Sequence, residues 1–293
     1  MVREALTHLK LIPSARVIDA TLGLGGHAEA ILRDYPEVRV LGLDRDPEAI
    51  KLATQRLKPF GDRLQTRHGS FADLDSLAAD FGPACGILMD LGISSWQLAE
   101  RGFSFQTDAP LDMRMDPGVD APAAELVNGL PEGELADFLY QYGEEHRSRR
   151  IAKAIVEARP VSTTQELAEV IATSVGRRGR LHPATKSFQA LRIAVNDELG
   201  AIERTLPLAI DLLAPGGRLA VISFHSLEDR IVKDAFRLAS TDCICPPKTP
   251  VCICGHVATT RILTKKPLTA DEAEIASNPR SRSARLLFVN TCT

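Results

Sequence analysis

Short apolar runs alternate with stretches of helical period in the first part of the chain. Strands are predicted at residues 16–20, 38–44, 64–68 and 86–91, of which 16–20, 38–44 and 86–91 are mostly apolar. The stretches between them predict helices at residues 26–35, 47–58 and 73–81. Pro47 directly follows Asp46, which suits a helix cap followed by a first-turn proline. This alternation predicts a parallel sheet with right-handed crossovers.

The alternation stops after Leu91. The next clear strand is predicted at 218–224, and a crossover connection is normally far shorter than the stretch between them. Helical period recurs in that stretch at residues 134–142, 147–158, 165–175 and 184–205. We therefore predict an all-helical domain at 109–194, inserted into an α/β core made of 1–108 and 195–293.

The α/β pattern resumes after the predicted insertion. It predicts a helix at 196–213, the strand at 218–224, a helix at 227–238 and late strands at 260–265 and 284–290. We expect one of the late strands to run antiparallel to the rest. The fold class is therefore α/β, with a Rossmann-like sheet and a helical insertion.

A glycine turn and an acid define a candidate cofactor site. The strand at 16–20 leads into Thr21-Leu22-Gly23-Leu24-Gly25-Gly26-His27, and the next strand ends in Asp44. Glycines let the backbone approach a ligand at the start of a helix, and an acid about twenty residues on can bind a ribose. The glycines alone also fit NAD, through Gly23-x-Gly25-x-x-Ala28, or a turn with no ligand.

Two further features favour S-adenosylmethionine over NAD. Asp19 precedes the glycines, where a carboxylate would sit badly beside a pyrophosphate but well beside a methionine ammonium. The strand at 64–68 is followed by Gly69-Ser70-Phe71, whose aromatic ring could pack on an adenine.

Asp90 is the candidate catalytic residue. It ends the fourth strand at the sheet edge where such folds bind ligands, and Leu91-Gly92-Ile93-Ser94-Ser95-Trp96-Gln97 follows. A carboxylate there could accept hydrogens from an amino acceptor, since charge-assisted bonds contribute about 1.5–3 kcal/mol. It could equally cap the next helix. Gln97 could reach the cofactor.

Cysteine placement argues against methylation of a pyrimidine carbon, which uses a covalent thiolate. Cys85 lies just before the fourth strand, at the end opposite to the one where such sheets bind ligands, and Cys292 lies close to the C-terminus. Transfer to nitrogen or oxygen is therefore favoured. Two further features each have two interpretations. His225 could act as a base or serve as a structural hydrogen-bonding residue. The basic turn 278–283 could contact phosphate or form a solvated hairpin.

Two further cysteine pairs, Cys243-x-Cys245 and Cys252-x-Cys254, could hold zinc in a reducing compartment. The usual zinc knuckle is C-x-x-C rather than C-x-C. We therefore interpret the segment as a cysteine-containing loop without a ligand and predict no metal site.

Composition and charge exclude some classes of protein. The 293 residues are 44% hydrophobic and 25% charged, which is ordinary for a globular protein. No apolar signal core opens the chain and no run of about eighteen apolar residues occurs, so we expect a cytoplasmic protein with no membrane partner and no disulfide framework. The net charge of −3 argues mildly against nucleic-acid binding.

Local charge points the other way. Residues 141–192 hold ten Lys and Arg against five Asp and Glu. Two arginine clusters stand out, at positions 147, 149 and 150 and at positions 177, 178 and 180. Either cluster alone also fits a solvated helix face or loop.

Long motifs give the chain a family resemblance. They are Asp19-Ala20-Thr21-Leu22-Gly23-Leu24-Gly25-Gly26-His27, Asp44-Arg45-Asp46-Pro47, Asp90-Leu91-Gly92-Ile93-Ser94-Ser95, Arg101-Gly102-Phe103-Ser104-Phe105, Pro110-Leu111-Asp112-Met113-Arg114-Met115-Asp116, Tyr142-Gly143-Glu144-Glu145, His182-Pro183-Ala184-Thr185, Ser223-Phe224-His225-Ser226-Leu227-Glu228-Asp229-Arg230 and Asn278-Pro279-Arg280-Ser281-Arg282-Ser283. With these, nearly the whole chain closely resembles the bacterial small-subunit ribosomal RNA cytosine-N4 methyltransferases of the MraW (RsmH) type. Trp96 stands where that family usually has proline, and Ala99 where an acid is common.

The resemblance implies a class I methyltransferase sheet and S-adenosylmethionine-dependent N4-methylation of a cytosine in the decoding region of 16S ribosomal RNA. The partner would be the small ribosomal subunit or a late assembly intermediate, with no DNA partner. Matching positions would place cofactor contacts at Gly25, Gly26, His27, Asp44, Phe71, Asp90 and Gln97. The helical insertion would be the substrate-side domain.

Two alternatives stay open at this point. One is a non-catalytic, cofactor-bound assembly factor that checks ribosomal RNA. The other is a small-molecule or NAD enzyme, although a basic insertion of this size is excessive for a small substrate.

Overall fold

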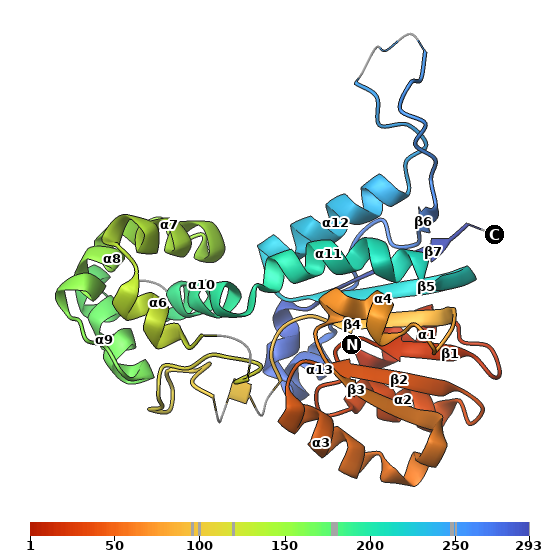
Figure 1. Cartoon of the computed structure of the whole chain (residues 1–293), viewed down its shortest axis with the longest axis horizontal. Helices are drawn as coiled ribbons and strands as arrows, with labels where there is room; N and C mark the ends of the chain where they lie inside the picture. The colour runs from red at the N-terminus through yellow and green to blue at the C-terminus, as the bar shows by residue number, and fades with distance from the viewer. Residues whose placement is uncertain are drawn as a thin grey trace. The chain divides into compact units, whose positions relative to one another are not determined.

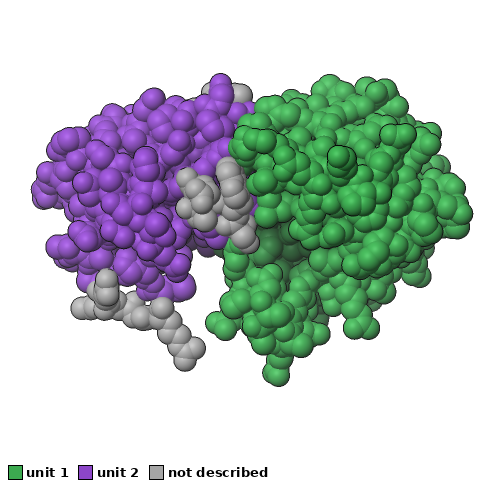
Figure 2. Space-filling model, turned by 90° about the horizontal axis from the view of Figure 1, so that it is seen from below, with its two compact units in different colours: residues 1–92, 199–293 green, residues 93–198 purple. Residues whose placement is uncertain are grey.

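Figure 1 shows the chain as a computed structural model, which describes residues 1–94, 97–98, 101–118, 121–176, 181–246, 249 and 251–292. Trp96, Ala99 and the arginines at 177, 178 and 180 lie outside the described residues. The chain divides into two compact units (Figure 2). Unit 1 comprises Met1–Gly92 and Leu199–Thr293, and unit 2 comprises Ile93–Glu198.

Unit 1 is built on a seven-stranded sheet, counting the described residues. Its strands are β1 (Arg16–Asp19), β2 (Arg39–Asp44), β3 (Leu64–His68), β4 (Ala84–Asp90), β5 (Leu213–Ser223), β6 (Thr260–Ile262) and β7 (Arg285–Thr291). Their order is β3-β2-β1-β4-β5-β7-β6. The first five strands pair in parallel, whereas β7 is antiparallel to both β5 and β6. The predicted class I methyltransferase sheet is therefore confirmed.

Helices cover both faces of this sheet, which explains why a central strand such as β4 is almost entirely apolar. Neighbouring residues of β1 point to opposite faces. Ile18 packs in a core with α4 (Leu74–Leu77), α11 (Glu198–Asp211) and α12 (Ser226–Ala239). Val17 packs in a core with α2 (Gly26–Asp34) and α3 (Pro47–Arg56). Because the helices fill both faces, the loops at the strand ends are left to bind ligands.

The shorter elements of unit 1 include several that the pattern did not predict. These are α1 (Val2–Leu9), α13 (Glu272–Ser277) and the 3-10 helices η1 (Lys58–Arg63), η2 (Phe71–Asp73) and η3 (Pro279–Ser283). The helix predicted at 73–81 is only the four-residue α4, preceded by η2. Ser70 accepts a hydrogen bond from the backbone N–H of Ala72, so a polar cap starts this segment earlier than the apolar period indicates.

Unit 2 is helical. Its helices are α6 (Ala123–Gly129), α7 (Glu132–Gly143), α8 (Ser148–Glu157), α9 (Thr164–Val175) and α10 (Thr185–Asn196). They enclose a core that includes Leu139, Ile151, Ile171 and Leu191. No helix among the described residues is long and apolar enough to cross a membrane.

The segment of helical period predicted at 184–205 holds two helices, α10 and the first part of α11, and the separate helix predicted at 196–213 corresponds to α11. α10 ends at Asn196 and α11 begins at Glu198, because Asp197 adopts the left-handed conformation with φ 46°. The Asn196 side chain stabilises this break: its amide donates to the Met113 carbonyl and its carbonyl accepts from the Met115 N–H, both at 2.8 Å. These long-range bonds carry no periodic signal in the sequence.

The unit boundaries differ from those expected. Unit 2 begins at Ile93 rather than at residue 109, and it ends at Glu198 rather than at residue 194. Phe103, Leu111, Met113 and Met115 belong to an irregular segment, yet they are buried in the core of unit 2. Their contribution explains the earlier start.

Candidate active site

Three carboxyl groups end three adjacent strands of unit 1. Asp19, Asp44 and Asp90 are the last residues of β1, β2 and β4, which lie side by side in the order β2-β1-β4. Because the strands are parallel, all three side chains lie at one edge of the sheet. This is the edge where open α/β sheets bind ligands.

The glycine turn after β1 requires glycine at two positions. Gly23 has φ 51° and Gly25 has φ 79°, a region that other residues rarely adopt. A Cβ on Gly25 would also lie 2.7 Å from Cδ1 of Leu57. Gly25 is the N-cap of α2, and the space beside Gly26 is open. The turn therefore presents backbone and a helix N-terminus next to the carboxyl groups.

Asp44 is fastened to this turn. One carboxylate oxygen accepts from the Gly23 N–H at 2.7 Å, and the other accepts from the Asp46 N–H at 2.9 Å. Burial raises the pKa of Asp44 to about 6, although the two N–H donors act against it. Each oxygen keeps a second lone pair, so the side chain can hold the turn and still accept from hydroxyl groups.

Asp19 is buried and only partly bonded. Its Oδ1 accepts from the Thr21 N–H at 3.3 Å, while Oδ2 has no hydrogen-bond partner among the described residues. Burial, helped by the nearby Asp90 and Asp44 carboxylates, raises the pKa of Asp19 to about 7, although the backbone N–H groups of Thr21 and Ala28 oppose the shift. Such a group is poised to ionise when a positive charge arrives.

Asp90 has a similar environment. Its Oδ1 has no partner in the described part of the chain, and its Oδ2 lies 3.6 Å from Nδ1 of His27. Burial, helped by the Glu228 carboxylate, raises the pKa of Asp90 to about 7, although the N-terminal ammonium of Met1 and the Arg280 guanidinium oppose the shift. The backbone N–H of Asp90 donates to the Thr21 hydroxyl at 2.7 Å, which ties the end of β4 to the glycine turn.

His27 is the second residue of α2 and is largely buried. Burial lowers its pKa to about 4, so the imidazole is neutral at physiological pH. Its Nε2 has no hydrogen-bond partner among the described residues. A neutral ring with a free nitrogen can contact a cofactor without competing with its positive charge.

Phe71 and Gln97 belong to different units. Phe71 opens η2 in unit 1, packs against the core, and its carbonyl accepts from the Thr205 hydroxyl at 3.0 Å. Gln97 belongs to unit 2 and is buried, and its side-chain carbonyl accepts from the Ser94 N–H at 2.9 Å. The contacts predicted from these two side chains to a cofactor stay predictions.

His225 has a structural role in α12. It is the N-cap, and its Nδ1 accepts from the Glu228 N–H at 3.4 Å. The Glu228 carboxylate in turn accepts from the Phe224 N–H at 2.7 Å. Sequence reasoning overlooked Glu228, which is fully buried and raises the pKa of Asp90. The signal was a capping box, a cap residue followed three positions later by glutamate.

The arginine cluster on α8 is partly exposed. Arg147 is tied to unit 2 through Glu145 at 3.4 Å and the Val175 carbonyl at 3.3 Å. Arg149 and Arg150 are exposed on the surface of the helix. Their guanidinium groups are therefore accessible to an anion.

Taken together, the edge of unit 1 fits a ligand that carries positive charge. Buried carboxyl oxygens of Asp19 and Asp90 are unpartnered within the described ranges, and the glycine turn leaves room for close approach. A carboxylate whose pKa is raised by burial recovers its ionised form beside a cation. S-adenosylmethionine has a sulfonium and an ammonium group, so the donor set fits it better than a pyrophosphate.

Nearly the whole chain is similar to known proteins. The MraW methylase family profile matches residues 1–292. The ribosomal RNA small subunit methyltransferase H of Dehalococcoides mccartyi is 51% identical over 292 residues, covering 98% of this chain and 84% of that protein. The protein of the same name from Citrifermentans bemidjiense is 52% identical, covering 93% and 91%. A solved rRNA methylase structure from Streptococcus thermophilus aligns with a TM-score of 0.45 and 11% identity, over 99% of this chain and 93% of that one.

Proposed function

The chain belongs to the MraW methylase family, and from this premise we propose that it methylates N4 of a cytosine in the decoding region of 16S ribosomal RNA. It is a class I methyltransferase of ribosomal RNA, and its cofactor is S-adenosylmethionine. The amino acceptor, the target region and a cytoplasmic location are parts of the proposal. The substrate would be the small subunit or a late assembly intermediate.

The observation that carries the proposal is the carboxyl group of Asp90. It is partly buried, ends β4 at the ligand edge, and has one buried oxygen, Oδ1, without a partner among the described residues. An exocyclic amine is a poor nucleophile while its lone pair is delocalised into the ring. A carboxylate that accepts a hydrogen bond from this amine favours the geometry from which nitrogen can attack.

The residues of unit 1 divide the binding of S-adenosylmethionine between them. When bound, the cofactor supplies an electrophilic methyl group on a sulfonium. Asp44 would accept from the ribose hydroxyls, Asp19 would bind the methionine ammonium, and Phe71 would pack beside the adenine. Gly25 and Gly26 keep the turn open, and His27 contacts the cofactor through its neutral ring.

Asp90 acts on the acceptor. Its carboxylate orients the amino group for a direct in-line displacement, so most of the catalysis is positioning. After transfer the product nitrogen loses a proton, and a carboxyl whose pKa is about 7 can take it up. Arg149 and Arg150 would hold phosphates of the RNA, with binding that weakens as salt rises.

The test is a transfer assay on the natural substrate. The purified chain and methyl-labelled S-adenosylmethionine are mixed with small subunits from cells lacking the modification, and the product is mapped by nuclease digestion and mass spectrometry. One N4-methylcytosine in the decoding region is expected. Label on another atom or another region would contradict the proposal. Binding of subunits and cofactor without any transfer would favour a non-catalytic assembly factor.

A further inference from the structure

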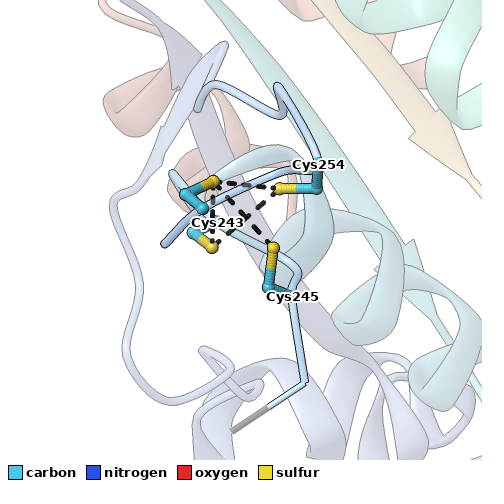
Figure 3. A group of neighbouring side chains, drawn as sticks. Cys243, Cys245 and Cys254 are labelled. Atoms are coloured by element: carbon cyan, nitrogen blue, oxygen red, sulfur yellow. Dashed lines mark hydrogen bonds between the residues drawn. The ribbon is translucent and has the colours of Figure 1, made fainter. Parts of the chain in front are cut away.

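Four cysteine sulfurs converge in the segment between α12 and β6. This segment extends from the body of unit 1 as a long hairpin-like loop (Figure 1). The Sγ atoms of Cys243, Cys245, Cys252 and Cys254 all lie within 4.8 Å of one another. Figure 3 shows the sulfurs pointing toward a common centre. The two C-x-C pairs thus form one group rather than two separate features.

The separations match a tetrahedral metal site. Cys252 lies 3.5 Å from Cys243, 4.0 Å from Cys245 and 3.5 Å from Cys254, and Cys243 lies 3.9 Å from Cys254, measured between Sγ atoms. Four thiolates at the usual Zn–S distance of about 2.3 Å lie about 3.8 Å apart in a tetrahedron. A disulfide bond is far shorter, at about 2.0 Å.

The backbone is arranged toward the sulfurs as well. The N–H of Ile244, between the first two cysteines, donates to Sγ of Cys254 at 3.5 Å. The N–H of Ile253, between the other two, donates to Sγ of Cys245 at 3.4 Å. Each C-x-C pair therefore donates to the opposite pair. Such outer-shell donors orient metal ligands and stabilise their negative charge.

The loop has no apolar core that could hold it in shape. Between Thr241 and Thr259 no described residue is buried, and Val251 and Ile253 are 72% and 84% exposed. The base of the loop is fastened to α12, since the Thr259 N–H donates to the Ala239 carbonyl at 2.9 Å. The described residues of the loop are thus not held by an apolar core, and ordering them costs conformational entropy that a cross-link offsets.

We propose that Cys243, Cys245, Cys252 and Cys254 bind one structural Zn²⁺ ion as a closed tetrathiolate site. Thiolates are soft ligands that select zinc over magnesium or calcium. Four protein ligands leave no open coordination position, so the ion holds the loop and takes no part in methyl transfer. This inference replaces the expectation of a ligand-free loop, because the sequence spacing did not reveal that the two pairs meet.

The first measurement is the metal content of the tag-free, full-length chain after expression with zinc and dialysis. Inductively coupled plasma mass spectrometry should find about one zinc ion per chain. The double variant Cys243→Ser/Cys252→Ser, with one change in each pair, should lose it. Cys292→Ser, which changes an exposed cysteine outside the loop, should keep it.

Folding and cysteine chemistry are checked on the same samples. The double variant should keep the circular dichroism of the wild-type chain, yet proteases should cut it faster within 241–259. With cobalt in place of zinc, the wild-type chain and Cys292→Ser should both show the visible absorption of a tetrahedral tetrathiolate. The double variant should not show it. A zinc-free wild-type chain, iron instead of zinc, or an intact mass lowered by the loss of four hydrogens through two disulfides would each overturn the proposal.

Discussion

Nδ1 of His27 lies 3.6 Å from Oδ2 of Asp90, so a neutral imidazole stands beside a carboxyl group with a raised pKa. This separation is longer than a hydrogen bond. The pair is therefore not a charge-neutralising ion pair, and the pKa of Asp90 stays raised to about 7 although the Met1 ammonium and the Arg280 guanidinium oppose the shift. The other carboxyl oxygen of Asp90, Oδ1, and the other ring nitrogen of His27, Nε2, have no hydrogen-bond partner among the described residues.

We expect Asp90→Asn to lower methyl transfer to the ribosomal subunit on the order of a hundredfold or more. The amide keeps the shape of the side chain but loses the negative charge that orients the acceptor and takes up its proton. Single-turnover rates with saturating cofactor and subunits measure the effect. A variant with wild-type rates would remove Asp90 from the proposed mechanism.

The same variant should be more stable than the wild-type chain without cofactor at pH 8. Burial raises the pKa of Asp90 to about 7, so its contribution to stability is full below the unfolded pKa of 3.8 and is lost as pH rises through about 7. Asparagine avoids burying that charge. We expect the Tm to rise by a few degrees at pH 8 and by less at pH 5. An unchanged Tm at both values would contradict the buried-charge argument.

Affinity for S-adenosylmethionine should fall as the pH is lowered through about 7. A cationic ligand prefers ionised carboxylates, and Asp19 and Asp90 both have pKa values raised to about 7 by burial. Protonation therefore competes with binding. Titration calorimetry between pH 5.5 and pH 8.5 checks this, with the double variant Asp19→Asn/Asp90→Asn as the control that should bind weakly at every pH. A flat profile in the wild-type chain would exclude these groups as cation partners.

Most of the sheet could be predicted from the sequence because both of its faces are covered by helices. Strands such as β1 and β4 are then short, mostly apolar runs bounded by turns, a local signal that needs no knowledge of distant residues. The carboxyl groups of Asp19, Asp44 and Asp90 follow from the same signal, since each simply ends a strand. Their convergence follows from the parallel order of the strands.

The features that escaped prediction depend on residues far apart in the chain. The end of α10 inside the helical period of 184–205 is stabilised by bonds from Asn196 to Met113 and Met115. The influence of Glu228 on Asp90 requires β4 and α12 to meet in space. The cysteine cluster requires a chain reversal between Cys245 and Cys252. No local period encodes such meetings.

Gly25→Ala should destabilise unit 1 by about 1–3 kcal/mol, since alanine must adopt the left-handed conformation. The added methyl would also approach the buried Leu57 side chain. Gly26→Ala is the matched control, because its Cβ would enter open space at the start of α2, and it should change stability by less than about 1 kcal/mol. Urea unfolding of both variants measures the difference. Equal losses would show that the turn geometry is not what requires glycine.

Asp44→Ala should remove most of the affinity for S-adenosylmethionine. The side chain holds the glycine turn through the Gly23 N–H and is proposed to accept from the ribose hydroxyls. Asp44→Asn keeps one carbonyl oxygen as acceptor and should lose less affinity than alanine. Titration calorimetry ranks the three chains. Near wild-type binding heats for the alanine variant would refute the role of Asp44.

Exchanging Arg149 and Arg150 for glutamate should weaken binding to small subunits while leaving cofactor affinity unchanged. Both side chains are exposed on α8, whereas Arg147 is tied to Glu145. If each exposed arginine neutralises a phosphate, its loss reduces the slope of log affinity against log salt by about one. Subunit binding measured at several salt concentrations gives that slope. Lys153→Glu, a change on the same helix next to Glu157, serves as the comparison for general charge effects. If all these exchanges weakened binding equally, the cluster would act only through its net charge, and the assignment of Arg149 and Arg150 as phosphate contacts would be wrong.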